Sequence, residues 1–146
     1  MKAAIVPLVL LWCEVLHCRV IVSSHFGHRG QMDLIDLQSC KDVVIEGHLE
    51  YKWLFHYQDH FFKFSILAPC TSKSPQEVAH VIIKDVISVI GAPMLLQSDN
   101  GKEFSNEVIS NIANMSGMKI IRGRPRHPQS QGSVERANGV VKQLLK

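Results

Sequence analysis

The hydrophobic period of this chain changes at Ser74, from the alternation typical of β-strands to the spacing of three and four residues typical of helices. Three predicted strands come before that point, at 31–37, 51–57 and 61–67. Helices and short strands are predicted to alternate after it, at 74–90, 94–97, 105–115, 119–121 and from Ser133 onward. The polar residues 58–60 are typical of a hairpin, so the first three strands are expected to be antiparallel. This order predicts a mixed α/β domain.

The helix after Ser74 has the clearest signals at both ends. Ser74 can cap it, Pro75 suits its first position, and Glu77 is placed to complete a capping box. Gly91 is expected to end the helix, and Pro93 prevents its continuation. Its apolar face is wide enough to predict packing against a sheet, through Val78, Ala79, Ile82, Ile83, Val86, Ile87 and Ile90.

Composition and length favour one soluble folded domain. The 146 residues are 46% hydrophobic and 20% charged, which excludes wholesale disorder, a collagen-like repeat and a disulfide miniprotein. Charge is uneven: residues 1–121 carry 10 Lys/Arg and 12 Asp/Glu, whereas residues 122–146 carry 6 Lys/Arg and one acid. This basic segment indicates either an anionic partner such as a phosphate backbone or an ordinary solvated helix and loop.

The first 28 residues differ from the rest of the chain. Met1-Lys2 precedes an apolar run over 3–12 that resembles a secretory signal peptide, although Glu14 and Arg19 interrupt the stretch after it. The run is too short to span a bilayer, so no membrane partner is expected. Residues 1–28 are therefore interpreted as a leader, either signal-like or disordered, and residues 29–146 as the domain.

Three acids occupy positions where α/β proteins present reactive groups. Asp33 lies inside the first strand, Asp99 just after the strand at 94–97, and Glu135 in the first turn of the last helix. Each also has an ordinary interpretation, because Asp99 can belong to a tight turn and Glu135 can favour the helix N-terminus. Asp36 could equally be the exposed acid of the first strand.

The residues around these acids resemble the catalytic core of retroviral and retrotransposon integrases. The matching segments are Gln31-Met32-Asp33, Ser98-Asp99-Asn100-Gly101 with Glu103-Phe104, and Gly132-Ser133-Val134-Glu135-Arg136-Ala137-Asn138. Between Asp99 and Glu135 lie 35 residues, the spacing of that family's Asp, Asp, 35, Glu triad. The resemblance covers 29–146 and is closest to Gypsy-type elements and host proteins derived from them, some of which carry KRAB or SCAN domains.

This resemblance implies a ribonuclease H-like, five-stranded mixed sheet flanked by helices and truncated at the C-terminus. It also implies a metal-dependent polynucleotidyl transferase or endonuclease that acts on DNA, with Asp33, Asp99 and Glu135 as catalytic residues and ligands of Mg²⁺ or Mn²⁺. Two such ions about 3.5–4 Å apart can activate the attacking oxygen and stabilise the leaving oxygen.

DNA is the partner that the resemblance implies, and a homo-oligomer is possible in this family. Glu135, Asn138, Lys142 and Lys146 follow one another at helical spacing, which places an acid and two lysines on one polar stripe. Gly139 stands where the family often has a further lysine. The candidate DNA-binding residues are Asn100, Lys102, Arg122, Arg124, Arg126, Asn138, Lys142 and Lys146.

Three function classes remain open. The first is an active integrase core that performs DNA integration, and the second is a host-adopted, catalytically silent module that binds nucleic acid or protein. The third is a truncated product sent to the secretory pathway, for which the sequon at Asn114 would matter. The basic segment, the four cysteines with no evident pairing and the DNA substrates of the resembling family favour a nuclear or cytosolic location, against the signal-like leader.

Overall fold

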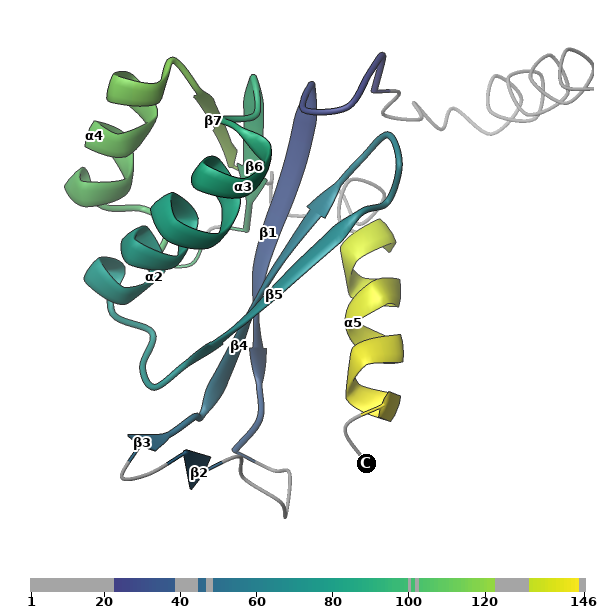
Figure 1. Ribbon diagram of the computed structural model, residues 1–146, viewed down its shortest axis with the longest axis vertical. Coiled ribbons are helices and arrows are strands. Elements are labelled where there is room, and N and C mark those ends of the chain that lie inside the picture. The colour runs from purple at the N-terminus through teal and green to yellow at the C-terminus, as the bar shows by residue number, and fades with distance from the viewer. Residues whose placement is uncertain are drawn as a thin grey trace, which may run out of the picture.

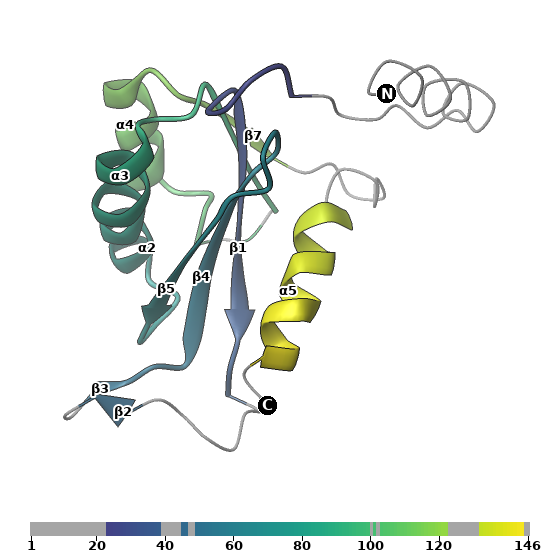
Figure 2. The same ribbon diagram turned by 45° about the vertical axis from the view of Figure 1, so that its right-hand side comes forward.

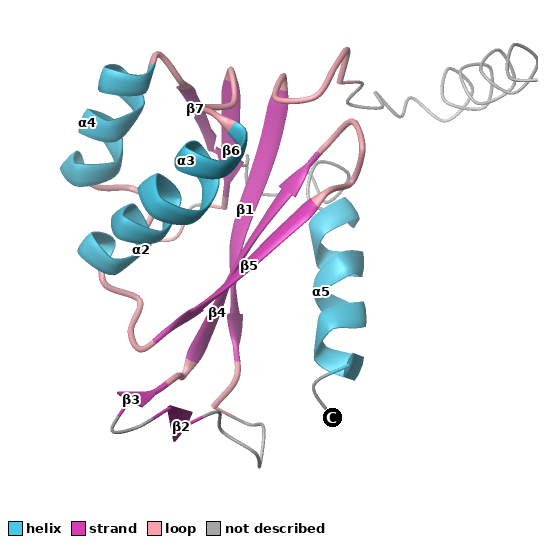
Figure 3. Cartoon of the chain, viewed as in Figure 1, coloured by secondary structure: helices cyan, strands magenta, loops and turns pink. Residues whose placement is uncertain are grey.

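A five-stranded mixed sheet forms the centre of the structure, a computed structural model that describes residues 23–38, 45–46, 49–99, 101, 103–122 and 132–144. The strand order is β5-β4-β1-β6-β7, as Figure 3 shows in magenta. The strands are β1 (Arg29–Asp36), β4 (Trp53–Asp59), β5 (Ser65–Cys70), β6 (Leu95–Ser98) and β7 (Lys119–Arg122). The order of strands along the chain agrees with the sequence-based prediction.

Strand directions divide the sheet into two halves that meet at β1. β4 and β5 pair with their neighbours in antiparallel register, and Asp33 of β1 lies directly opposite His56 of β4. β6 and β7 pair in parallel, and Gln31 of β1 lies beside Gln97 of β6. Because β1 has one antiparallel and one parallel neighbour, groups from both halves of the sheet can meet beside it.

The helices cover both faces of the sheet. α2 (Pro75–Val81) continues through a π-helical segment, η1 (Ile82–Ile87), into the short α3 (Ser88–Ile90). This continuous helix and α4 (Glu107–Ser116) pack on one face, while α5 (Gly132–Leu144) lies on the other (Figures 1 and 2). No helix in this described part of the chain is long and apolar enough to cross a membrane.

The expected capping box at α2 forms only in part. The Ser74 hydroxyl accepts a hydrogen bond from the Glu77 amide at 3.3 Å, as predicted. The Glu77 carboxylate instead accepts from the amides of Thr71 at 2.6 Å and Ser72 at 2.9 Å, which fixes the loop before the helix. Partial burial acts to raise the pKa of Glu77, but the hydrogen bonds from the hydroxyls and amides of Ser72 and Thr71 outweigh it and lower the pKa. Gly91 ends the helix with a φ of 81°, which favours glycine.

The hairpin between β4 and β5 is longer than predicted. Two aromatic residues, Phe61 and Phe62, were expected to start a strand but lie in the turn, where they are 45% and 69% exposed. The Asp59 carboxylate accepts hydrogen bonds from both of their amides, at 3.0 and 2.9 Å, and Lys63 takes a φ of 61°. The strand therefore begins at Ser65, since these local bonds outweigh the β-propensity of phenylalanine.

Two further differences concern short elements. A small hairpin of β2 (Ile45–Glu46) and β3 (Leu49–Glu50) occupies part of a region for which no regular structure was predicted. α4 is capped by the side chain of Asn106, which accepts from the Ile109 amide at 3.1 Å, rather than starting at Ser105. Neither difference alters the sheet.

The hydrophobic core lies between the sheet and the helices α2 to α4. Gly30 of β1 is essential to its packing, because a Cβ atom there would overlap the ring of the buried Tyr57. The largest fully buried apolar side chains are Tyr57, Phe55, Phe104, Met32, Ile35, Ile82, Leu96, Ile109, Val78 and Val86.

Candidate functional site

Asp33 lies in the middle of β1, and its side chain faces α5. One carboxylate oxygen accepts a hydrogen bond from the Leu34 amide at 2.8 Å, and the other accepts from the side-chain amide of Asn138 at 2.6 Å. Burial raises the pKa of the Asp33 carboxyl above its usual value. The charge of Asp99 raises this pKa further, whereas the two hydrogen bonds lower it.

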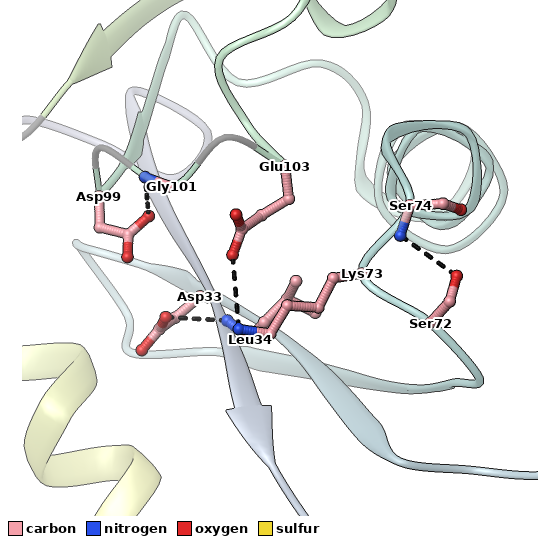
Figure 4. Close-up of polar contacts among 8 residues, drawn as sticks. All are labelled: Asp33, Leu34, Ser72, Lys73, Ser74, Asp99, Gly101 and Glu103. Atoms are coloured by element: carbon pink, nitrogen blue, oxygen red, sulfur yellow. Dashed lines mark hydrogen bonds and ion pairs between the residues drawn. The ribbon is translucent and has the colours of Figure 1, made fainter.

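Asp99 follows the last residue of β6. The parallel register pairs Gln31 with Gln97, so two further residues along both strands bring Asp33 beside Asp99. The side chain of Asp99 accepts from the Gly101 amide at 2.9 Å, which holds the turn shown in Figure 4. A Cβ atom on Gly101 would lie 2.9 Å from an Asp99 oxygen and 2.7 Å from the Glu103 carboxyl, so glycine allows this close approach.

A further acid, Glu103, lies close to this turn. Its carboxylate is 3.9 Å from the ammonium group of Lys73, which also stands 3.9 Å above the Trp53 ring (Figure 4 draws the ion pair). Glu103 belongs to the matching segment identified in the sequence, but its ion pair with Lys73 has no sequence signal. This ion pair connects the loop that contains Asp99 and Glu103 to Lys73, in the segment before α2.

Glu135 falls in the first turn of α5, one turn before Asn138, and its side chain lies outside the described residues. In the described part of the chain, no group of three or more His, Cys, Asp or Glu side chains could hold a metal ion. The structure therefore brings together Asp33 and Asp99, two of the three predicted metal ligands.

Asn138 has an environment that the sequence did not indicate. It was expected on the polar stripe of the last helix, among the DNA-binding residues. Its amide is instead used within the protein, because its nitrogen donates to Asp33 and its oxygen lies 2.5 Å from Nδ1 of His56. Asn138 thus joins α5 to both β1 and β4.

His56 is the residue near the site that sequence reasoning missed. It is fully buried, and its second ring nitrogen lies 3.1 Å from the Ser65 hydroxyl. A polar residue within an apolar strand is only weak evidence of a functional role. The strand register, which places His56 opposite Asp33, is what associates this histidine with the site. That register pairs two strands separated by residues 37–52, and no sequence pattern predicted it.

Two of the predicted DNA-contacting cations are described, and both are exposed. Arg122 ends β7 and pairs with Ser98, so it lies at the same end of the sheet as Asp99. Lys142 lies one turn beyond Asn138 in α5. The remaining predicted residues lie outside the described part of the chain: Asn100, Lys102, Arg124, Arg126 and Lys146.

Sequence comparisons show that this chain is similar to a human KRAB-A domain-containing protein and to retroviral polyproteins, although no family model matches it. It is 37% identical over 116 residues to the human KRAB-A domain-containing protein 2, covering 79% of this chain and 22% of that protein. It is 28% identical over 131 residues to the Gag-Pro-Pol polyprotein of human T-cell leukemia virus 2, covering 88% of this chain and 9% of the polyprotein. The chain thus spans less than a quarter of the length of these relatives.

Structural comparison identifies the fold. The catalytic core domain of HTLV-2 integrase, solved in complex with magnesium, matches with a TM-score of 0.64 at 20% identity, over 84% of this chain and 72% of that one. This likeness confirms the ribonuclease H-like fold that the sequence predicted. The chain is a homologue of retroviral Gag-Pro-Pol polyproteins and of the human KRAB-A domain-containing protein 2, and it has the fold of a retroviral integrase catalytic core.

Proposed function

We propose that this integrase-like domain cleaves and joins DNA phosphodiester bonds with Mg²⁺ or Mn²⁺ held by Asp33, Asp99 and Glu135. The observation that carries the proposal is the position of Asp33 and Asp99, side by side where two parallel neighbouring strands approach their carboxyl ends. Burial is the main cause of the raised pKa of Asp33, and repulsion by the like charge of Asp99 adds to it. A divalent cation between the two carboxylates would relieve this repulsion.

The donor set fits a hard cation. Magnesium prefers carboxylate oxygens and keeps several waters, so two or three acids are sufficient to hold it. When bound, such ions lower the pKa of the attacking hydroxyl or water and stabilise the leaving oxygen. The chain itself keeps the acids in place, through Leu34 and Asn138 at Asp33 and through Gly101 at Asp99. The magnesium bound to the HTLV-2 core supports the choice of metal.

DNA is the proposed substrate, and exposed cations are its proposed contacts. Arg122 and Lys142 would bind phosphates beside the acids, together with Asn100, Lys102, Arg124, Arg126 and Lys146. Such contacts recognise charge rather than sequence, so binding is expected to be sequence-independent and sensitive to salt. Self-association is proposed as well, since the HTLV-2 core was solved in dimeric and trimeric forms.

The chemical proposal is tested with Asp99→Asn. An asparagine oxygen can still accept the Gly101 amide, so the turn should persist while one metal-binding charge is lost. We expect wild-type protein to nick and join labelled DNA only with Mg²⁺ or Mn²⁺, and Asp99→Asn to lose this activity without losing DNA binding. The matched control is Asp36→Asn, because Asp36 is an exposed acid at the end of β1, the strand that carries Asp33, and this variant should retain activity. Equal activity of wild type and Asp99→Asn would refute the assigned role.

DNA binding is tested separately with Lys142→Ala. The affinity for several unrelated duplexes should fall about equally, and the slope of log affinity against log salt should flatten by about one unit. Lys84→Ala is the matched control, because Lys84 is exposed on η1, across the sheet from α5. Fluorescence anisotropy over a range of salt gives both slopes. A loss confined to one DNA sequence would contradict a phosphate contact.

A second candidate is a binding module without catalysis. The observation that favours it is the similarity to a KRAB-A domain-containing protein rather than to viral polyproteins alone. Salt-sensitive DNA binding with no metal-dependent nicking or joining by the wild type would favour this candidate. Both candidates imply a nuclear or cytosolic location, which we propose and which imaging of the tagged full chain would test.

A further inference from the structure

A line of hydrogen-bonded side chains runs beneath α5 and ends on Asp33. It begins at Gln58 and passes through Ser65, His56 and Asn138. The successive separations between donors and acceptors are 3.4, 3.1, 2.5 and 2.6 Å. None of the first three residues has a part in the proposed chemistry, so their arrangement needs its own explanation.

The charge of Asp33, at the end of the line, determines which group donates and which accepts in each hydrogen bond. An ionised Asp33 can only accept, so the Asn138 amide must turn its nitrogen toward that carboxylate. The Asn138 oxygen then faces His56, and because an amide oxygen can only accept, Nδ1 of His56 must carry a hydrogen. The imidazole orientation is thereby coupled to the charge on Asp33.

The hydrogen bonds on the Nε2 side of the imidazole run in the same donor-to-acceptor direction. With its hydrogen on Nδ1, a neutral His56 has an acceptor at Nε2, and the Ser65 hydroxyl can donate to it. The hydroxyl oxygen of Ser65 remains free to accept from the Gln58 side-chain amide. Every bond therefore donates toward Asp33, and the Nδ1–H tautomer of His56 is the one that satisfies all four residues.

Burial excludes the usual catalytic roles for this histidine. His56 has no exposed surface, and both of its ring nitrogens are engaged by protein groups. It cannot reach solvent or substrate as a general base, nor ligate a metal, without breaking one of these bonds. Its contact is with Asn138, which lies one turn after Glu135 in α5.

We propose that His56 is a positioning residue whose Nδ1–H tautomer fixes the Asn138 amide, and through it both the Asp33 carboxylate and the seat of α5 on the sheet. This inference rests on the proposed function, because His56 would keep β1 and α5, which carry the proposed metal ligands Asp33 and Glu135, in their relative positions. Residues that orient metal ligands commonly change metal affinity by 10–100-fold when replaced.

The hydrogen-bond direction is tested by nitrogen NMR of isotope-labelled wild-type protein near neutral pH. The His56 ring should show a protonated, pyrrole-type Nδ1 and an unprotonated, pyridine-type Nε2. The opposite assignment would overturn the proposal. This measurement needs neither metal nor activity, so it remains decisive even if the proposed function fails.

The positioning role is tested with two variants of His56. His56→Leu fills much of the same space but removes the donor to Asn138, whereas His56→Asn offers a side-chain amide that can restore it. In His56→Leu we expect the amides of α5 to exchange hydrogen about ten-fold faster, because a buried bond is lost, while those of α4 keep their rates. His56→Asn should recover most of the wild-type rate.

Metal affinity links the variants to the site. Titration calorimetry with Mn²⁺ should show binding at least ten-fold weaker for His56→Leu than for wild type, and within a few-fold of wild type for His56→Asn. Unchanged exchange in α5 together with unchanged Mn²⁺ affinity in His56→Leu would overturn the proposal. A wild type that binds no Mn²⁺ would instead refute the proposed function, and the exchange rates would then decide the role of His56 alone.

Discussion

The burial of His60 predicts that the protein loses stability in mild acid. Its side chain is 9% exposed in the β4–β5 turn, and its Nε2 donates to the side-chain oxygen of Gln31 at 3.1 Å. Burial lowers the pKa of His60 to about 4, and the positive charges of Lys63 and Arg29 contribute in the same direction. His60 therefore stays unprotonated in the folded protein at pH values at which it is protonated in the unfolded chain, where its pKa is about 6.5.

The size of the effect follows from the two pKa values. Since the unfolded chain binds the additional proton, stability falls as the pH drops below about 6.5, and the loss is complete below about 4. Between pH 7 and pH 5 the free energy of unfolding should decrease by about 2 kcal/mol from this group alone. The raised pKa of Asp33 acts with the opposite sign, because stability from that group is lost as the pH rises through its folded pKa.

Urea denaturation at pH 7 and pH 5, followed by circular dichroism, measures this difference. His60→Gln can keep the hydrogen bond to Gln31 but cannot be protonated, so its stability should change by about 2 kcal/mol less than that of wild type. The contribution of Asp33 is common to both proteins and cancels in the comparison. His80→Gln, at an exposed histidine of α2, is the matched control and should behave as wild type. A His60→Gln protein with the full wild-type pH dependence would refute the reasoning.

Two further predictions concern the core. Gly30→Ala should lower the free energy of unfolding by about 1–3 kcal/mol, because the added methyl group overlaps the Tyr57 ring, and urea denaturation at neutral pH would measure it. Unchanged stability would mean that Tyr57 can move away at little cost. Burial raises the pKa of the Cys70 thiol to about 11, so Cys70 should resist iodoacetamide at pH 8 until the protein unfolds. Peptide mapping by mass spectrometry would detect its labelling in the native state, which would contradict this expectation.

Much of the fold could be predicted because its signals are local. The cap at Ser74 and the glycine at Gly91 depend on residues within a few positions, and both ends of that helix were found where the structure has them. The start of β5 was misplaced because two phenylalanines suggested a strand. The carboxylate of Asp59 and the left-handed Lys63 decided the turn instead, and neither effect appears in an apolar periodicity.

The candidate site could be predicted only in part from the sequence. The closeness of Asp33 and Asp99 follows from the parallel pairing of β1 with β6, because Asp99 comes just after the carboxyl end of β6 and the register brings it beside the middle of β1. The contacts of Asn138 with Asp33 and His56 join residues 105 and 82 positions apart. Such contacts depend on the register of β1 with β4 and on the seat of α5, which no local pattern specifies.

The alternation of side chains along β1 separates the residues that hold the fold from those that would perform chemistry. Met32 faces the hydrophobic core beneath α2 to α4, whereas its neighbour Asp33 faces α5 and the polar line that includes His56. Replacing Asp33 would therefore leave the packing of Met32 and of the core beneath α2 to α4 in place. A domain that lost this acid could keep its sheet and the helices α2 to α4, and so could keep the binding role proposed above without the chemistry.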